Sequence, residues 1–552
     1  MTDLLRNIFI FDEQNPLIFT RFFFWGFFAV VLAFYSFLYK NKSLRNAYLF
    51  LVSLFFYYKT GGLFFFILLF STITDFGIGY AIYHATSPLR KKLWLALSIT
   101  LNLGVLAFFK YDYFFTETIN QVFNTNLEVV THSAKWSNAL FGTSFDLGKI
   151  LPPIGISFFT FQTISYSIDV YRGLIKPVNN IADFGFYVSF FPQLVAGPIV
   201  RAADFIPQLY KPYQLTQREF GLGFYLILKG LTKKMLIGDY LAVNLIDRVF
   251  SNPASYSGFE NLSALFGYSV QVYCDFSGYT DVAIGVAMLL GFYLPKNFNS
   301  PYKAKSVGEF WKRWHISLSS WLKDYLYIPM GGNRGASNFT YISLTIVLLF
   351  IVLLTGKLIF IPIFIFFIGI IWILTQYFPG MRLTVSTNIN LMMTMIIGGL
   401  WHGSSWMFVI WGGLNGLGLV AYKFWRKVSP YEKIDHWLIN TWKIFFTFCF
   451  ITFTRIWFRG ESMQGTYELL KQVTGNFGWE AVPSMLLGYW KVLAILAFGL
   501  IMHWLPDKIK CAYRDWFIDR PIYQKILIAS GIIFVIYQSI SAELTPFIYF
   551  QF

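Results

Sequence analysis

Apolar stretches long enough to cross a membrane recur from one end of the chain to the other. Examples are Ile18–Tyr39, Gly61–Ile82, Trp437–Phe458 and Met485–Leu505. A helix needs about 20 apolar residues to span the hydrocarbon core, whereas barrel strands would show a period-two alternation that these stretches lack. The pattern therefore predicts an all-α polytopic membrane protein with about 11–13 membrane-embedded segments.

Polar residues interrupt several of the other apolar stretches. Phe184–Val200 contains Gln193, Gly197 and Pro198, which membrane helices tolerate only where neighbours satisfy the freed backbone groups. We therefore expect broken or re-entrant segments there and in Pro152–Val170, which Gln162 interrupts. Phe220–Phe250 carries lysines and aspartates among its apolar residues, and we expect a long helix that lies against the membrane.

Two further apolar segments, Tyr341–Leu354 and Leu358–Tyr377, predict a hairpin around Gly356 and Lys357. The chain shows no sequence repeat, no low-complexity tract and no linker that would separate a soluble domain. We therefore expect a single transmembrane domain over residues 1–552, with the motifs described below at about 150–425 and the hairpin at about 341–377.

The composition agrees with a membrane protein and accounts for the positive charge. Hydrophobic residues make up 56% of the chain and charged residues 13%, against about 25% charged in soluble domains. The net charge of +16 is explained more simply by basic cytoplasmic loops than by nucleic-acid binding. The first segment, Met1–Pro16, is acidic and polar, so no cleaved signal peptide is expected.

His402 lies within Gly399–Trp406, between two tryptophans and at the mouth of a long apolar run. A histidine at bilayer depth is costly to place and is a functional-site candidate for that reason. Imidazole is also well suited to take a proton from a hydroxyl near neutral pH. A buried histidine with a purely structural hydrogen bond is the alternative. The neighbouring glycines favour function, because they allow backbone or substrate to approach closely.

The aromatic and basic segment Phe310–Tyr325 predicts one amphipathic helix in the membrane interface, with His315 on the seam between its faces. A histidine that only anchors this helix fits the pattern as well as a functional one does. The remaining histidines lie beside loops or basic clusters and are interpreted as ordinary interfacial residues: His84, His132, His436 and His503.

Asp275 and Asp281 are acidic residues inside the apolar stretch Leu262–Leu294. Pairing with a lysine or arginine across the bundle and a role at a functional site are equally open for them. Loops for nucleotide binding, zinc-protease helices and serine-nucleophile elbows are missing from the sequence. The three cysteines show no metal-ligand spacing, so we expect no metal site.

Several ordered motifs resemble signature segments of the membrane-bound O-acyltransferase (MBOAT) family. They are Gln162–Gly173, Phe191–Arg201, Asp275–Asp281, Asn297–Tyr302, Trp311–Gly332 and Trp401–Gly403. The resemblance runs from about residue 20 to the closing Pro546–Phe552. It is strongest for the alginate O-acetyltransferase branch, and the D-alanyl transferases of teichoic acids are more distant.

This resemblance implies a ring of helices around a thin centre that is pierced by a tunnel open to both sides. It implies that His402 is the essential histidine and that His315 supports the reaction from the cytoplasmic side. The family moves an acyl group from a cytoplasmic thioester to an acceptor beyond the membrane. For this branch we expect acetyl-CoA as the donor, an exported polysaccharide or an extracytoplasmic partner protein as the acceptor, and a bacterial inner membrane as the location.

Roles for further residues follow from the resemblance and from thioester chemistry. His402 would accept the hydroxyl proton, and His315 with Ser319 would orient the thioester or stabilise the oxyanion. Three basic residues could hold the phosphates of the donor, or could only anchor their helix to anionic lipid: Lys312, Arg313 and Lys323. Polar residues of the motifs are candidates to line the tunnel: Asp275, Tyr279, Asp281, Asn299 and Trp401.

The two motif histidines are 87 positions apart, wider than the family leads us to expect, and the additional length is the hairpin. This departure affects the surface that a partner would contact. A rival interpretation is a transporter or flippase for a polysaccharide or lipid-linked intermediate, since Asp75, Asp275 and Asp281 lie in apolar stretches. Such a protein should show paired internal repeats. A third interpretation, a structural subunit of an export complex, predicts tolerance to the loss of both histidines.

Overall fold

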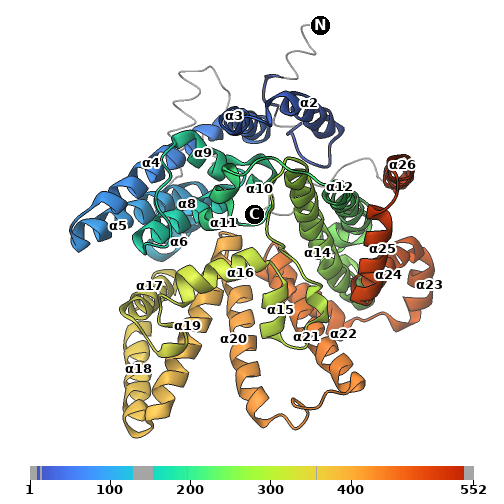
Figure 1. Cartoon of the computed structure of the whole chain (residues 1–552). Helices are drawn as coiled ribbons and strands as arrows, with labels where there is room; N and C mark the ends of the chain where they lie inside the picture. Colours follow the sequence, from blue (N-terminus) through green and yellow to red (C-terminus); the bar gives the residue numbers. More distant parts are fainter. Residues whose placement is uncertain (1–8, 13–14, 128–152, 196, 356, 540–552) are drawn as a thin grey trace. The chain divides into compact units, whose positions relative to one another are not determined.

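The computed structural model in Figure 1 describes residues 9–12, 15–127, 153–195, 197–355 and 357–539. Every regular element within these ranges is a helix, which confirms the all-α prediction. The chain divides into two compact units. Unit 1 comprises Met1–Asn102, Ile154–Leu318 and Asp435–Phe552, and unit 2 comprises Leu103–Pro153 and Ser319–Ile434. The closing motif at 546–552 lies outside the described residues.

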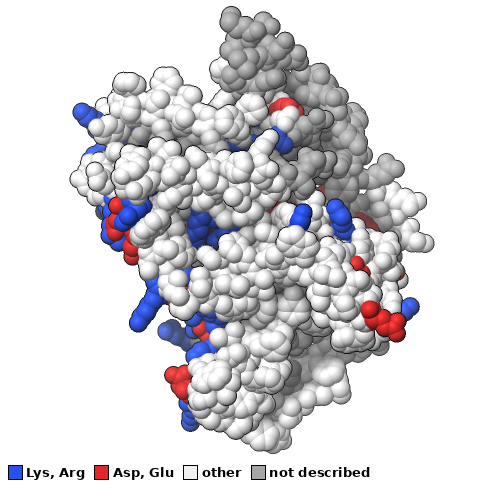
Figure 2. Space-filling model, turned by 90° about the vertical axis from the view of Figure 1, so that its right-hand side faces the viewer, with Lys and Arg blue, Asp and Glu red and all other residues white. Residues whose placement is uncertain are grey.

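Membrane-length helices occur in both units. Within the described ranges, six helices are long and apolar enough to span a membrane: Lys42–His84, Pro88–Glu117, Gly380–His402, Trp406–Val428, Trp437–Arg459 and Ile522–Ser539. The pair Trp479–Gly488 and Trp490–Trp504, which is bent by 83°, would be a seventh. Much of the face shown in Figure 2 carries no charged side chain, as expected of a surface that contacts lipid. The protein is a polytopic membrane protein. The ring of 11–13 segments with a tunnel stays a prediction.

The first half of unit 1 contains eight helices within the described residues. They are α2 (Phe22–Leu38), α3 (Lys42–Gly61), α4 (Phe65–His84), α5 (Pro88–Leu106), α8 (Ile156–Tyr171), α9 (Ile181–Ser189), α10 (Phe191–Leu194) and α11 (Ala202–Leu209). The short α9 and α10 confirm that the segment Phe184–Val200 is broken. The same prediction for Pro152–Val170 is wrong, because α8 continues through Gln162, a residue that keeps its backbone N–H and favours helix.

Asp75 joins three of these helices. Its carboxylate accepts hydrogen bonds from Ser98 Oγ at 2.5 Å and Asn102 Nδ2 at 2.6 Å on α5, and from Ser167 Oγ at 3.0 Å on α8. The side chain is fully buried. A buried polar group is stable only when it is hydrogen-bonded, so this network fixes α4, α5 and α8 together.

A long, nearly continuous helical region follows. It consists of α12 (Gln217–Leu231), the π-helical turns η3 (Thr232–Asp239) and η4 (Ala242–Ile246), and α13 (Asp247–Ser251), and it leads to α14 (Gly258–Leu289). The start of α14 is set by a capping box, in which Ser257 and Glu260 satisfy each other's backbone N–H groups. The predicted helix over Phe220–Phe250 is therefore present, with π turns that the apolar pattern does not show.

Two glycine pairs allow α12 and α14 to pack backbone against backbone. A Cβ atom on Gly230 would lie 2.5 Å from the carbonyl oxygen of Gly278, and one on Gly285 would lie 2.6 Å from that of Gly223. Only glycine fits at such close approach, which is the usual way in which membrane helices pack tightly. This contact brings the lysines of α12 and η3 next to the acids of α14.

The remaining helices of unit 1 are α15 (Val307–Arg313), α16 (Ile316–Leu322), α21 (Trp437–Arg459), α22 (Met463–Gly475), α23 (Val482–Gly488), α24 (Trp490–Trp504), α25 (Asp507–Ile518) and α26 (Ile522–Ser539). In Figure 1, α24, α25 and α26 (red) lie beside α12 and α14 (green). The last residues of α16 already belong to unit 2.

Unit 2 contains the expected hairpin and the His402 region. Its helices are η2 (Ala107–Tyr111), α6 (Asp112–Phe123), η7 (Lys323–Tyr327), α17 (Asn338–Thr355), α18 (Phe360–Tyr377), α19 (Pro379–His402) and α20 (Trp406–Val428). Helices α17 and α18 are the predicted hairpin, and both contact α19. The hairpin is therefore a packed part of unit 2.

Candidate active site

His402 is the last residue of α19, and side chains from η2 satisfy the carbonyl groups of this helix end. Lys110 Nζ donates to the carbonyl oxygens of Trp401 at 2.8 Å and of His402 at 3.0 Å. The Tyr111 hydroxyl donates to the carbonyl of Leu400 at 2.6 Å. The last carbonyl groups of a helix have no partner within the helix, so these side-chain donors satisfy groups that burial would otherwise leave unpaired. The backbone of His402 is thereby held in place.

Two tryptophans fix the His402 ring. The imidazole is buried and meets the ring of Trp401 edge-on at 4.9 Å between centroids and that of Trp411, on α20, at 5.1 Å. Edge-to-face packing of this kind restricts a ring to one orientation. The structure thus holds one imidazole in a set position among apolar groups, which suits a directed proton transfer.

Glycines near His402 allow α19 and α20 to touch. A Cβ atom on Gly399 would lie 3.1 Å from Gly412 Cα, and one on Gly403 would overlap the ring of Phe408. The close approach that the glycines permit is therefore an approach of backbone and ring from α20. This contact between α19 and α20 sets the position of the α19 C-terminus, which carries His402, relative to Trp411.

The prediction of a single amphipathic helix over Phe310–Tyr325 is wrong. Helix α15 ends at Arg313, Trp314 is extended, and His315 takes a left-handed conformation with φ +43° before α16 begins at Ile316. The cause is the segment 297–299, which pairs with the backbone at the break. Asn299 N–H donates to the carbonyl of Arg313 and Ile316 N–H to that of Asn297, both at 2.9 Å. These bonds take the place of the helical ones.

The His315 ring is fully buried in unit 1. It packs edge-on against Phe276 of α14 at 4.7 Å, and its Nδ1 accepts the N–H of Leu318 at 3.3 Å. Burial lowers the pKa of His315 to about 3, so the imidazole is neutral at physiological pH. Because Nδ1 accepts a hydrogen bond, the proton is on Nε2, which makes Nε2–H a donor.

Two of the four residues predicted to hold the acyl donor, Arg313 and Lys323, lie near carboxylates of the protein itself. The guanidinium of Arg313 pairs with Glu309 at 2.7 and 2.9 Å and donates to the carbonyl of Asn299 at 3.1 Å. Lys323 lies 3.9 Å from Asp324 and is largely exposed. Lys312 is exposed and Ser319 is half-buried. A donor-binding role for these four residues stays a prediction.

The acids of α14 form ion pairs with lysines of α12 and η3. Asp275 lies 2.5 Å from Lys234, and Asp281 lies 3.0 Å from Lys229 and 2.8 Å from Lys233. The pairing that the sequence left open is thus present, and it joins the two helices where their glycines touch. Removing one partner of a buried ion pair destabilises a protein more than the intact pair stabilises it, because the other charge remains buried without a partner.

The other tunnel candidates are distributed over both units. Tyr279 is buried in α14 with its ring 5.2 Å from that of Phe19. Asn299 accepts a hydrogen bond from Lys296 at 2.9 Å. Trp401 belongs to unit 2, where it contacts His402. Asp281 and Asn299 are brought together in unit 1, because both line the cavity described next.

Unit 1 contains a partly open cavity of about 750 Å³ between α12, η3, α14, α24, α25, α26 and the segment 294–300. His503, at the end of α24, lines it and is 5% exposed. The interpretation of His503 as an ordinary interfacial residue is therefore wrong. Its burial results from the rings of Tyr273 and Tyr302, 4.7 and 5.0 Å away, which sequence spacing does not reveal. His132 lies outside the described residues.

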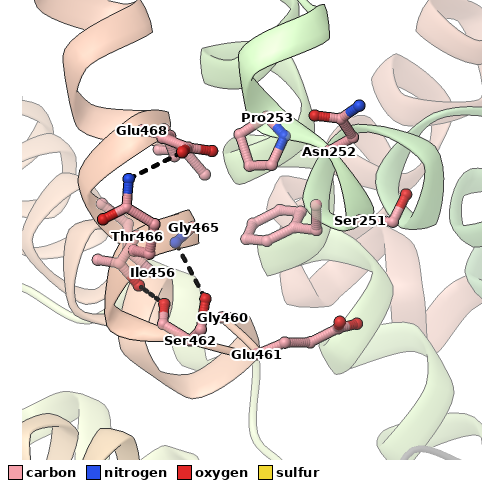
Figure 3. Close-up of a pocket in the computed structure, with 13 residues that line it drawn as sticks. Ser251, Asn252, Pro253, Ile456, Gly460, Glu461, Ser462, Gly465, Thr466 and Glu468 are labelled. Atoms are coloured by element: carbon pink, nitrogen blue, oxygen red, sulfur yellow. Dashed lines mark hydrogen bonds between the residues drawn. The ribbon is translucent and has the colours of Figure 1, made fainter.

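A smaller cavity of about 170 Å³ in unit 1 is shown in Figure 3. It lies between the end of α13 and α22, and its visible carboxylates are those of Glu461 and Glu468. The Ser462 hydroxyl accepts the N–H of Gly465 at 3.0 Å and caps α22. Its polar groups thus serve the start of a helix, and we assign it no chemistry.

Comparison with known proteins identifies the family. The profile of the membrane-bound O-acyltransferases matches residues 92–384. The chain belongs to this family. A protein named "probable alginate O-acetylase" from Pseudomonas aeruginosa is 33% identical over 451 residues, which cover 79% of this chain and 73% of that relative.

More distant relatives act on other polymers according to their names. A peptidoglycan O-acetyltransferase from Helicobacter pylori is 31% identical, covering 80% of this chain and 75% of the relative. A teichoic acid D-alanyltransferase from Bacillus subtilis is 28% identical over 56% of this chain and 69% of the relative. The resemblance of the motifs is confirmed, and the MBOAT chain described here is an O-acyltransferase.

Proposed function

We propose that this MBOAT protein moves an acetyl group from acetyl-CoA on the cytoplasmic side of a bacterial inner membrane to a hydroxyl beyond that membrane. The acceptor hydroxyl belongs to an exported polysaccharide or to an extracytoplasmic partner protein. The names of two relatives, an alginate O-acetylase and a peptidoglycan O-acetyltransferase, support the choice of acetyl and of a polymer.

The observation that carries the proposal is the fixed, buried imidazole of His402. Its carbonyl is anchored by Lys110, and its ring is held between Trp401 and Trp411. A hydroxyl is a poor nucleophile at neutral pH, and a positioned base that accepts its proton in the transition state accelerates attack by roughly 10²–10⁴. A histidine that only fills space would not need both its carbonyl and its ring to be held in one position.

In the proposed reaction the hydroxyl oxygen attacks the thioester carbon while its proton passes to His402. The new C–O bond forms, the C–S bond breaks, and the leaving thiolate takes up the proton from His402. The negative charge that develops on the thioester oxygen requires a donor. His315 presents Nε2–H in its neutral form, and we assign it this stabilising role.

The test is transfer from labelled acetyl-CoA by the purified protein in liposomes, with the candidate polysaccharide or neighbouring secreted protein on the other side. Label that appears in the acceptor as an ester, and only when acetyl-CoA is supplied, supports the proposal. Passage of unmodified polymer or lipid intermediate without any thioester would instead favour the transporter. No transfer and no transport, with complex assembly intact, would favour the structural subunit.

The buried acids that suggested a transporter have structural partners. Asp75 accepts three hydrogen bonds within α4, α5 and α8, and Asp275 and Asp281 pair with lysines. A proton or ion pathway needs acids that can exchange their partners. These contacts therefore favour the acyltransferase over the transporter.

A further inference from the structure

The large cavity of unit 1 is positively charged. The described residues that line it include five basic side chains, Lys229, Lys233, Lys296, Lys510 and Arg514, and two carboxylates, those of Asp281 and Asp507. The basic residues thus outnumber the acidic ones by three. A cavity with such an excess attracts anions, and its low-dielectric walls strengthen the attraction.

The contacts show where the excess charge lies. Lys229 and Lys233 share the single carboxylate of Asp281. The carboxylate of Asp507 pairs at 3.0 Å with Lys303, which is not among the described lining residues. One lysine of the Asp281 group therefore has no carboxylate of its own.

Lys296 and Lys510 have neutral partners. Lys296 Nζ donates to Asn299 Oδ1 at 2.9 Å, and Lys510 Nζ donates to Ser300 Oγ at 3.1 Å and to the carbonyl of His503 at 2.5 Å. Burial and the nearby Lys303 lower the pKa of Lys510 to about 8, and burial also lowers the pKa of Lys296. Lys233, which lines the same cavity, repels both ammonium groups, and an anion bound in the cavity would relieve this repulsion.

His503 supplies a second, independent feature of the same cavity. Its Nε2 accepts the N–H of Tyr302 at 3.1 Å, so the proton of the neutral ring is on Nδ1. This Nδ1 is buried and has no hydrogen-bond partner among the described residues. A buried donor without a partner is rare and costly, and it commonly indicates a bound group.

One wall of the cavity is apolar and includes Leu222, Leu226, Phe498, Met502 and Ile532. A volume of about 750 Å³ falls in the range of about 300–1,000 Å³ typical of small-molecule sites. We propose that this cavity binds the phosphate group of a larger molecule with net negative charge, with the phosphate at Lys296, Lys510 and His503 and the attached chain along the apolar wall. Lysine ammonium groups and an N–H donor are common phosphate ligands.

Two molecules at a membrane offer this chemistry. One is an anionic phospholipid, whose acyl chains would follow the apolar wall. The other is the phosphate-bearing thioester donor, and that assignment rests on the proposed function. Phosphate binding itself does not depend on acyl transfer, and so it is measured without acceptor.

The experiment is calorimetric titration of the full-length protein in neutral detergent at pH 7. The probes are dihexanoyl phosphatidylglycerol, its zwitterionic phosphocholine counterpart, coenzyme A and inorganic phosphate. The variants are Lys510→Gln and Lys296→Gln, each removing one charge of the cavity. The matched control is Lys508→Gln, which removes an exposed lysine from the same helix, α25.

We expect saturable binding of phosphatidylglycerol or coenzyme A that each cavity variant weakens about tenfold or more and that Lys508→Gln leaves unchanged. Whichever of these two probes binds with the higher affinity identifies the molecule that supplies the phosphate. Equal binding of the phosphocholine lipid, or inorganic phosphate binding as tightly as either larger probe, would overturn the proposal. So would affinities that neither cavity variant changes. Loss of acetyl transfer with phosphate binding intact contradicts the proposed function alone.

Discussion

Replacing Gly412 with alanine tests whether the contact between α19 and α20 positions His402. A methyl group at this position would lie 3.1 Å from the Cα of Ile396 and 3.2 Å from that of Gly399. It would also lie within 3.0 Å of the carbonyl oxygen of Met395. Ordinary contacts of such a carbon begin at 3.4 Å, so the two helices must separate by up to about 1 Å to relieve the contact with the Met395 carbonyl.

The expected effect is on both stability and rate. Overpacking of this kind costs about 1–3 kcal/mol. A displacement of about 1 Å at a reacting group reduces the rate by roughly 10²-fold. We therefore expect Gly412→Ala to lower the melting temperature slightly and to reduce the initial rate of acyl transfer about 10- to 100-fold.

The adjacent glycine provides a matched control. A methyl group on Gly413 would meet nothing within 4 Å, so Gly413→Ala adds the same group to the same helix without a collision. Both variants are compared by thermal unfolding and by transfer rate in the same detergent. If Gly412→Ala and Gly413→Ala transfer at the same rate, the close helix contact does not position His402, and the argument fails.

Three further changes test the surroundings of the two histidines and the fold. Lys110→Met removes the amine that donates to the end of α19. The kcat should fall about tenfold with an unchanged KM for the acyl donor, and Lys110→Arg should restore part of the kcat, whereas equal loss in both variants would exclude a positioning role. His315→Asn introduces a residue that also tolerates the left-handed backbone, so the melting temperature should stay near that of the wild type while the rate of acyl transfer falls. A wild-type rate would show that His315 takes no part in the reaction. Asp75→Ala leaves three buried donors without their acceptor. The free energy of unfolding, measured by heat or denaturant, should fall by about 3 kcal/mol or more. An unchanged unfolding curve would show that the Asp75 network does not stabilise the fold.

Local patterns in the sequence predicted most of the helices. The apolar run Trp437–Phe458 is α21, Trp437–Arg459. The hairpin segments Tyr341–Leu354 and Leu358–Tyr377 correspond to α17, Asn338–Thr355, and α18, Phe360–Tyr377. These elements follow from residues that are neighbours along the chain, and hydrophobic periodicity reports such neighbours directly.

The break at His315 could not be predicted in this way. Periodicity over Phe310–Tyr325 favours one helix, but a hydrogen bond to the carbonyl of Asn297 and one from the N–H of Asn299 compete with the helical bonds at that point. Both asparagines lie outside that stretch, and their pairing with it depends on the tertiary fold. The left-handed His315 is the consequence.

The residues around the candidate site were predicted in part. His402 and His315 were found from their motifs and settings, whereas Lys110 and His503 were missed. Lys110 was visible only as a single lysine near the end of an apolar stretch, and His503 as a histidine near a basic segment. Which carbonyl or ring each would meet depends on helices far away in the sequence. No local spacing contains that information.

The most direct test of the central claim is the rate of acetyl transfer by His402→Ala. The variant is purified alongside the wild type, its fold is checked by thermal unfolding, and ester formation on the acceptor is followed from labelled acetyl-CoA. If His402 accepts the hydroxyl proton, the rate falls by roughly 10²–10⁴ while the protein stays folded. A folded His402→Ala protein that transfers at the wild-type rate would contradict the account.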